Sequence, residues 1–306
     1  MTHPELAVVV VNYRSSDLLA VNLGAIARAD LSMTVVVVDN FSDLVERRRV
    51  SELCSRMGWI SVFNERNLGF GGGMNVGVET AIGVGRTRFL LINPDAVTDS
   101  ASIRALVDRI DENDLVLASP IVTRPDGSPW FAGSDLYLDD GRVRSARRRS
   151  EAPQARTMPW LSGACLMISL RLWERVGGFD DRYFLYWEDI DFSHRVLTRG
   201  GLLEVVETAT AIHAEGGTQG AEGHQRAGQP KSASYYYYNI RNRWLFAALH
   251  LSSSRQRAWA RHSLPVAWEI LLQGGRRQML RSPRPIWAAI RGTRDGFAFA
   301  RSRDRV

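Results

Sequence analysis

Three carboxylates stand close together in the segment WEDIDFSHR, at Glu188, Asp189 and Asp191, directly after an aromatic run at 183–187. A carboxylate beside aromatic walls can act as a general base, and aromatic walls suit the faces of sugar rings. A structural alternative stays open. Acids are stabilised at the start of a helix by its dipole, and Asp191 can pair with Arg195 four residues later.

A second pair of residues could hold a metal ion. Asp95 follows a hydrophobic run in LLINPDAV, where a carboxylate can bind a hard divalent cation that also binds a diphosphate. One carboxylate makes a weak site, and His213, in TATAIHAEGG, would strengthen it only by converging with Asp95. The alternatives are an acid that opens a turn after Pro94 and a histidine that is structural.

Glycines crowd the segment NLGFGGGMNVG at 67–77. It is not a dinucleotide-binding fingerprint, since it follows the second predicted strand and lacks the GxGxxG spacing. Glycine lets backbone N–H groups close on a ligand, so the segment predicts a loop that approaches a phosphate or nucleotide. A tight turn without a ligand is the alternative.

These segments lie between predicted strands and helices that alternate along the chain. Short β-branched runs predict strands buried on both faces, at 6–11, 35–38 and 89–92. Helix-like stretches lie between them, at 17–29, 44–57 and 75–82. This alternation predicts a parallel sheet, in which ligands bind beyond the carboxyl ends of the strands. Asn12, Asp39 and Asp95 follow such ends and should converge on one edge.

The second half of the chain has a different character. Residues 120–159 read as strands and a long basic loop that carries Arg147–Arg149, either solvated or close to anionic ligand groups. A helix should begin at Asp189 and stop at Gly200–Gly201, and a strand at 203–206 should lead to His213. From Tyr235 onward the pattern is helical and basic. We therefore predict a catalytic domain at 1–234, with halves at 1–118 and 119–234, and a helical appendage at 235–306.

Composition and charge limit the function classes. The 306 residues are 45% hydrophobic and 24% charged, which is typical of a globular protein. Residues 231–306 carry a net charge of +12, which leaves the other 230 at −6, so an anionic partner such as a membrane, nucleic acid or acidic glycolipid is expected. Two distant cysteines, Cys54 and Cys165, favour a reducing compartment. Neither a secretory leader nor a spanning helix is expected from the hydrophobic runs.

Taken together and in this order, the motifs resemble family 2 inverting glycosyltransferases of GT-A fold, especially their rhamnosyltransferase-like branch. The matching segments, which span about residues 6 to 217, are VVVNYRSSDLL, VVVVDNFSD, NERNLGFGGGMNVG, LLINPDAV, LSGACLMISLRLWERVGGFDDRYFLYWEDIDFSHRVLTRGG and the late His213. The resemblance implies an α/β fold with a Rossmann-like, mainly parallel sheet flanked by helices, and a C-terminal helical appendage.

The resemblance also implies roles for individual residues. Asp189 would be the catalytic base of a Glu188–Asp189 pair, while Asp95 and His213 would hold Mg²⁺ or Mn²⁺. The implied nucleotide-binding residues are Asn12, Asp39, Asn67, Gly69, Phe70, Gly71, Asn75 and Asn93, with Asp39 recognising the pyrimidine base. The implied acceptor-binding residues are Tyr186, Trp187 and Asp191. Many family members have an acid where this chain has Asn93, which makes the diphosphate itself an important metal ligand.

The implied reaction is a single displacement with inversion at the anomeric carbon. Resemblance to the branch favours dTDP-L-rhamnose as donor, with UDP-sugars as the alternative, and a glycan or polyprenyl-diphosphate-linked acceptor. The basic, tryptophan-rich tail fits a cytoplasmic, peripheral enzyme at an anionic membrane face, without a nucleic-acid partner. The alternative for the tail is a packing or dimerisation appendage, which leaves a homodimer open. Two other classes are weighed: a nucleotidyltransferase, which would need a basic triphosphate loop that NYRSSD lacks, and a non-catalytic relative, against which the intact acids argue.

Overall fold

The computed structural model describes residues 5–27, 32–214 and 230–303. The chain divides into two compact units, each made of separate segments. The first, here called the sheet unit, comprises Met1–Gly133, Pro159–Phe184 and Glu188–Glu222. The second, the helical unit, comprises Ser134–Met158, Leu185–Trp187 and Gly223–Val306. The domain boundaries expected at 118 and 234 stay predictions.

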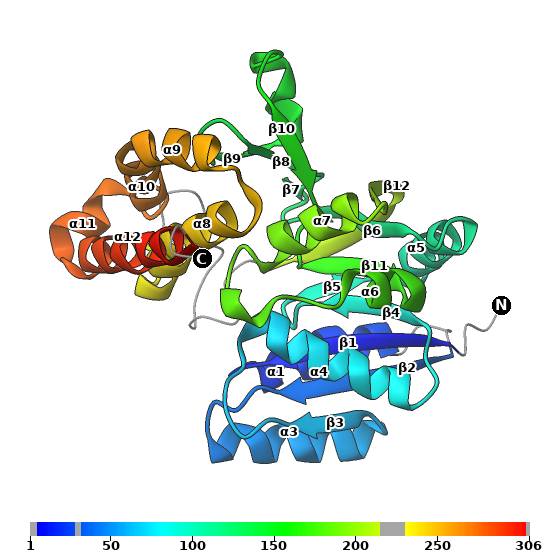
Figure 1. The fold of residues 1–306 in the computed structure, drawn as a ribbon. Coiled ribbons are helices and arrows are strands. Elements are labelled where there is room, and N and C mark those ends of the chain that lie inside the picture. The colour runs from blue at the N-terminus through cyan, green and yellow to red at the C-terminus, as the bar shows by residue number, and fades with distance from the viewer. Residues whose placement is uncertain (1–4, 28–31, 215–229, 304–306) are drawn as a thin grey trace. The chain divides into compact units, whose positions relative to one another are not determined.

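A nine-stranded sheet forms the core of the sheet unit, with the order β3-β2-β1-β4-β11-β6-β12-β5 and with β7 paired to β6 (Figure 1). Its strands are β1 Leu6–Asn12, β2 Met33–Asp39, β3 Ile60–Phe63, β4 Arg88–Ile92, β5 Ala96–Thr98, β6 Val116–Thr123, β7 Pro129–Phe131, β11 Cys165–Ser169 and β12 Leu202–His213. Strands β1 to β4 pair in parallel, whereas β11 runs antiparallel to both β4 and β6. The sheet is therefore mixed, and β6 and β12 form a further parallel pair.

The strands predicted from β-branched runs are confirmed in β1, β2 and β4. All seven residues of β1 are buried, because β1 lies between β2 and β4 in the interior of the sheet. Its register with β2 places Asn12 beside Asp39. Two polar side chains therefore meet where two buried strands end.

Helices flank the sheet. Their bounds are α1 Ser16–Leu18, π-helix η1 Leu19–Leu23, α2 Gly24–Ala27, α3 Leu44–Met57, α4 Gly69–Gly83, α5 Ser100–Glu112, α6 Leu170–Val176, 3-10 helix η3 Asp181–Tyr183 and α7 Glu188–Thr198. The predicted helix at 44–57 is confirmed, and its ends have clear causes. The Asp43 carboxylate accepts the N–H groups of Val45 and Glu46, and Gly58 ends the helix at φ +68°. The helix predicted at 17–29 is instead α1, η1 and α2, and its last two residues lie outside the described part.

The loop predicted from the glycine cluster is wrong, because α4 already begins at Gly69. Glycine in a helix interior costs about 1 kcal/mol relative to alanine, so a packing reason is needed. A Cβ atom on Gly77 would lie 2.3 Å from Val9, and one on Gly73 would lie 2.9 Å from Val11. These two glycines let α4 approach β1 closely.

The helical unit holds a small sheet of order β10-β8-β9 and most of the C-terminal helices. The bounds are β8 Ser134–Tyr137, β9 Val143–Ser145, 3-10 helix η2 Ala146–Glu151, β10 Thr157–Trp160, α8 Ala233–His250, α9 Ser253–Arg261, α10 Ser263–Leu272, α11 Arg276–Arg281 and α12 Arg284–Arg303. The expected basic loop at Arg147–Arg149 is thus a 3-10 turn, in which Arg149 pairs with the buried Asp135. Within the described residues, no helix has the length and apolarity to cross a membrane.

Candidate functional site

Asn12 and Asp39 meet at the carboxyl edge of the parallel strands, as the strand ends predicted. Asn12 Nδ2 donates to Asp39 Oδ1 at 3.3 Å and to Glu46 Oε1 at 3.2 Å. Asn12 Oδ1 accepts the backbone N–H and the hydroxyl of Ser15. Asp39 is fully buried and accepts Arg47 Nε at 2.9 Å. The carboxylate is therefore already paired with a guanidinium inside the protein.

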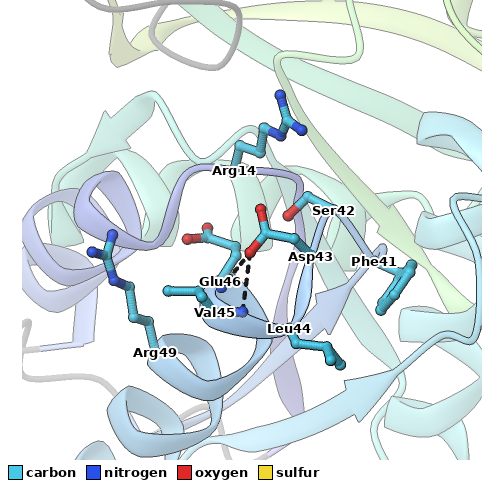
Figure 2. Close-up of a pocket in the computed structure, with 8 residues that line it drawn as sticks. All are labelled: Arg14, Phe41, Ser42, Asp43, Leu44, Val45, Glu46 and Arg49. Carbon is cyan, nitrogen blue, oxygen red and sulfur yellow. Dashed lines mark hydrogen bonds between the residues drawn. The ribbon is translucent and has the colours of Figure 1, made fainter.

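A pocket of about 720 Å³ opens beside this edge, between the segments after β1 and β2 and the start of α3 (Figure 2). Its lining residues are Arg14, Phe41, Ser42, Asp43, Leu44, Val45, Glu46 and Arg49. Glu46 is buried and accepts the backbone N–H and the hydroxyl of Ser16, both at 2.8 Å. None of the site residues expected from the sequence lines this pocket.

Asn40, which the sequence reasoning missed, organises the segment before α4. Its Nδ2 donates to Asn67 Oδ1 at 2.9 Å and to the carbonyl of Gly69 at 2.8 Å. Its Oδ1 accepts Asn64 Nδ2 at 3.1 Å and the N–H of Leu68 at 3.0 Å. One buried amide therefore fixes four points of the loop from 64 to 69. The sequence feature that could have identified Asn40 is its position directly after Asp39, at the end of a predicted strand.

The remaining residues of the expected nucleotide group do not all lie together. Asn75 uses its whole side-chain amide on Phe179, donating to its carbonyl and accepting from its N–H, both at 2.8 Å. A Cβ on Gly71 would lie 2.8 Å from the same Phe179. The Phe70 ring lies beside Gly163, where an added Cβ would meet it at 3.1 Å. Asn75 and Gly71 thus face the segment before α7 rather than Asp39.

Asp95 and His213 converge although 118 residues separate them, because β12 pairs antiparallel with β5. His213 Nε2 lies 3.0 Å from Asp95 Oδ1 and 3.5 Å from Asn93 Nδ2. Both side chains are buried, and Trp130, another residue the sequence reasoning missed, packs its ring 4.5 Å from the imidazole. His213 Nδ1 is buried without a hydrogen-bond partner among the described residues.

This pair fits two ligands of a divalent ion. Asp95 Oδ1 and His213 Nε2 lie at hydrogen-bond distance, 3.0 Å, and a carboxylate oxygen and an imidazole nitrogen are both ligand types that divalent ions accept. No group of three or more His, Cys, Asp or Glu that could hold a metal occurs in the described part of the chain. Asp95 and His213 are thus two candidate ligands, and a metal site built on them stays a prediction.

Glu188 and Asp189, at the start of α7, are the two acids most altered by their surroundings. Burial raises the pKa of Asp189 to about 6, against the opposing effect of N–H groups of Gly163 at 3.1 Å and Ile190 at 2.9 Å. Burial, and then the charge of Asp189, raise the pKa of Glu188 well above its usual range. Glu188 Oε2 is buried and has no partner among the described residues. Asp189 is therefore the acid that carries the negative charge near neutral pH.

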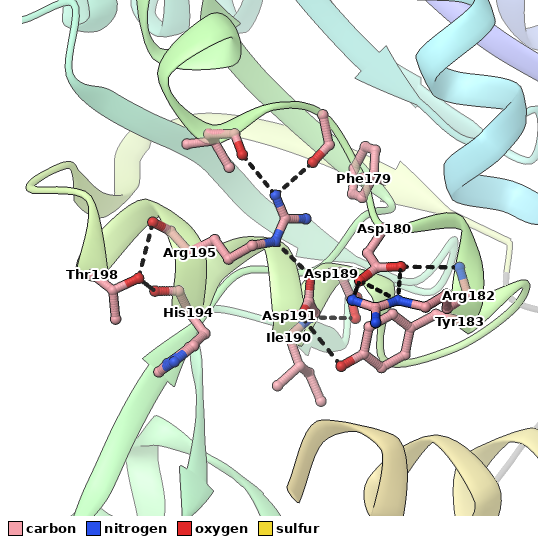
Figure 3. Close-up of polar contacts among 12 residues, drawn as sticks. Phe179, Asp180, Arg182, Tyr183, Asp189, Ile190, Asp191, His194, Arg195 and Thr198 are labelled. Carbon is pink, nitrogen blue, oxygen red and sulfur yellow. Dashed lines mark hydrogen bonds and ion pairs between the residues drawn. The ribbon is translucent and has the colours of Figure 1, made fainter. Parts of the chain in front are cut away.

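Asp191 has a different environment from its two neighbours. It is fully buried, pairs with Arg195 Nε at 2.7 Å and accepts the Tyr183 hydroxyl at 3.2 Å (Figure 3). Arg195 also donates to the carbonyls of Val176 and Gly178. This is the i,i+4 pair that the structural alternative predicted, so Asp191 ties α7 to the end of α6. A role in acceptor binding stays a prediction.

Tyr186 and Trp187 belong to the helical unit, and their backbone is strained. Their φ values are +63° and +73°, a region that L-residues rarely adopt. Asn242 Nδ2 donates to the carbonyls of Leu185 and Tyr186 at 2.9 and 2.7 Å. The Trp187 ring is buried 5.8 Å from that of Phe246. The Trp187 ring therefore packs in the core of this unit, and acceptor binding by Tyr186 and Trp187 stays a prediction.

Comparison with known sequences gives a family. A family model described as "Glycosyltransferase like family 2" matches residues 3–247. N-acetylglucosaminyl-diphospho-decaprenol L-rhamnosyltransferase of Mycobacterium tuberculosis (strain ATCC 25618 / H37Rv) is 28% identical over 197 residues, which are 59% of each chain. The chain thus spans less than two thirds of the length of that relative.

Two further relatives extend the similarity. A low-salt glycan biosynthesis hexosyltransferase of Haloferax volcanii is 25% identical over 261 residues, 83% of this chain and 78% of the relative. A dTDP-rhamnosyl transferase of Shigella flexneri is 22% identical over 182 residues, 60% of each chain.

Solved structures share the fold. GalNAc-T7 with UDP, GalNAc and Mn²⁺ gives a TM-score of 0.57 at 14% identity, covering 84% of this chain and 54% of its own. A mannosyltransferase of Pyrobaculum calidifontis with GDP-Man and Mn²⁺ gives 0.55 at 14% identity, covering 97% and 86%. At these identities the likeness concerns the fold alone, and it confirms the expected α/β class with GT-A-like architecture.

Proposed function

We propose that this chain, which belongs to glycosyltransferase-like family 2, transfers L-rhamnose from dTDP-L-rhamnose, with inversion, to a hydroxyl of a polyprenyl-diphosphate-linked glycan. The product would serve cell-wall or surface-polysaccharide synthesis. The names of the mycobacterial and Shigella relatives support the donor, and the mycobacterial name supports the lipid-linked acceptor. A UDP-sugar is the alternative donor, since GalNAc-T7 was solved with UDP.

The observation that carries the proposed chemistry is the state of Asp189. A general base works best when its pKa lies near the working pH, and burial brings the pKa of Asp189 to about 6. Its Oδ2 is held by the Gly163 N–H at 3.1 Å, which fixes the direction of the carboxylate. In the proposed reaction Asp189 accepts the proton of the acceptor hydroxyl as that oxygen attacks the anomeric carbon. The diphosphate leaves from the opposite face.

Glu188 would assist without acting as the base. Its raised pKa keeps a proton on it while Asp189 is ionised, which avoids two adjacent buried charges. A protonated Glu188 would leave the neighbouring carboxylate free to accept the hydroxyl proton.

Asp95 and His213 would hold Mg²⁺ or Mn²⁺, with Asn93 at the margin of the site. The bound ion would supply positive charge against the negative charge that develops on the departing diphosphate. The chain's own contribution is the 3.0 Å pairing of Asp95 with His213 in a buried site walled by Trp130.

The nucleotide would bind at the carboxyl edge of the sheet. We assign base recognition to Asp39 and Asn12, and diphosphate contact to the loop that ends at Asn67 and Gly69. The ion pair of Asp39 with Arg47 supports this assignment, since a fixed carboxylate can accept the imide N–H of a pyrimidine. Phe70, Gly71 and Asn75 would act through the packing of α4. Tyr186, Trp187 and Asp191 remain proposed acceptor residues.

A panel of sugar nucleotides tests the proposal. Purified protein is incubated with dTDP-L-rhamnose, UDP-sugars or GDP-mannose, with a polyprenyl-diphosphate-linked acceptor, and with or without Mn²⁺. Transfer should occur with dTDP-L-rhamnose and inversion, should need the ion, and should be lost in Asp189→Asn. An Asp108→Asn variant, at an exposed position of α5, is the matched control. Transfer from a UDP-sugar alone would replace the donor, and full activity of Asp189→Asn would remove the proposed base.

A further inference from the structure

The end of the helical unit presents large apolar side chains to solvent on three successive helices. They are Leu264 and Trp268 on α10, Leu280 on α11, and Ile286, Trp287 and Ile290 on α12. Leu280 is 87% exposed and Trp287 is 67% exposed, values at which the side chains contribute little to the core. Exposed tryptophans on an apolar surface indicate an interaction surface.

Packing explains why these residues point outward on α12. The helix faces α8 with small residues: a Cβ on Gly292 would lie 2.6 Å from the carbonyl of Tyr237, and one on Gly296 would lie 2.8 Å from Trp244. Glycines on one side therefore bring the two helices together. Trp287 and Ile290 are three residues apart, so they share the opposite side, where no core requires them.

The same region is strongly basic. Residues 274–294 contain six arginines and neither Asp nor Glu. Four of them, Arg276, Arg277, Arg281 and Arg284, form no ion pair with a carboxylate of the described residues. The only acid of α10, Glu269, is engaged by Arg142 at 2.6 Å. The positive charge is thus available to a partner.

We propose that this surface, the outer faces of α10, α11 and α12, docks on an anionic lipid bilayer. Tryptophan side chains are enriched at the headgroup level of membranes, leucine and isoleucine insert below that level, and arginine pairs with lipid phosphates. A nucleic acid would use the arginines but not the exposed aliphatic side chains. The combination therefore fits a lipid surface, and it does so whichever sugar the active site transfers.

Two pairs of substitutions separate the charged from the apolar contribution. The full chain is sedimented with phosphatidylcholine vesicles and with vesicles that also contain phosphatidylglycerol. Replacing Arg281 and Arg284 by Gln should lower binding to anionic vesicles about fivefold per arginine. Replacing Trp287 and Ile290 by Ser should lower binding roughly tenfold or more, because it removes the inserted area. Added salt should weaken binding of the parent protein.

The matched controls are Arg56→Gln and Leu202→Ser, which alter exposed residues of the sheet unit. Both should bind as the parent protein does, and circular dichroism should confirm that every variant is folded. In the parent protein, tryptophan emission should shift to the blue on binding, and the shift should shrink in Trp287→Phe. The proposal is overturned if the parent protein ignores anionic vesicles at low salt, or if the α11–α12 variants bind as the controls do. It is also overturned if RNA binds as tightly and displaces the vesicles.

Discussion

Replacing Asp189 by Asn should make the protein more stable while removing its proposed activity. The substitution keeps the size of the side chain and an oxygen that can accept the Gly163 N–H, although it gives up the hydrogen bond from the Ile190 N–H. It removes a charge that burial disfavours, as the pKa of about 6 indicates. The folded state thus holds the Asp189 proton more tightly than the unfolded chain does. That stabilisation is complete below the unfolded pKa of about 4 and is lost as the pH rises through about 6.

The expected magnitude follows from the difference between the two pKa values. A pKa of about 6 against an ordinary value of 3.8 corresponds to about 3 kcal/mol at alkaline pH. Asp189 is only half-buried, and Glu188 titrates with it, so we expect a gain of about 1–3 kcal/mol at pH 8. The gain should shrink to well under about 1 kcal/mol near pH 4, where Asp189 is protonated in the folded protein and about half protonated in the unfolded chain.

Urea unfolding of the parent protein and of Asp189→Asn at pH 8 and at pH 4 measures this difference. The control Asp108→Asn, on the exposed side of α5, should have nearly the same free energy of unfolding as the parent protein at either pH. Transfer should fall by about 10²–10⁴ in Asp189→Asn, with nucleotide affinity unchanged. If the variant is no more stable than the parent protein at pH 8, the carboxylate is not penalised by burial, and our reason for its function as a base fails.

Three further outcomes are expected. The transfer rate of the parent protein should fall below a pH of about 6, as Asp189 becomes protonated, and a rate profile flat to pH 5 would contradict this. Asp95→Ala and His213→Ala should each remove the metal-dependent part of nucleotide binding measured by calorimetry, and binding without metal should be unchanged; retention of the metal effect in both would exclude this site. Gly77→Ala should destabilise the protein by about 1–3 kcal/mol, because its Cβ would lie 2.3 Å from a β1 valine. Gly83→Ala, whose Cβ would meet nothing within 4 Å, is the control and should be neutral or slightly stabilising.

The elements that the sequence predicts well have strong local causes. The runs that became β1 and β2 are β-branched and buried on both faces, and α3 has Asp43 at one end and Gly58 at the other. The strand β3 was not predicted, because its four residues are half-buried at best and show neither a continuous apolar run nor a strict alternation. Short strands at the margin of a sheet depend on their neighbours more than on their own composition.

The residues of the candidate site also differ in how far the sequence alone could place them. Asn12 and Asp39 could be placed together, since parallel strands end at one edge. The contact of Asp95 with His213 needed the antiparallel pairing of β12 with β5, which no local pattern reveals. Asn40 looks like any amide after a strand, and its four hydrogen bonds exist only once the loop from 64 to 69 has folded over it.

The glycines of α4 connect the sheet to the segment that leads to the acids of α7. A Cβ on Gly69 would lie 2.1 Å from the carbonyl oxygen of Phe184, which instead accepts the N–H of Phe70 at 2.8 Å. Phe184 itself has a φ of +61°, a conformation that costs about 1–3 kcal/mol in an L-residue and persists only when its surroundings hold it. Gly69 is therefore explained by its close approach to the backbone of Phe184, which lies four residues before Glu188. A side chain at Gly69 would displace this backbone before it met any ligand, so Gly69→Ala should disturb the acids of α7 even if nucleotide still binds.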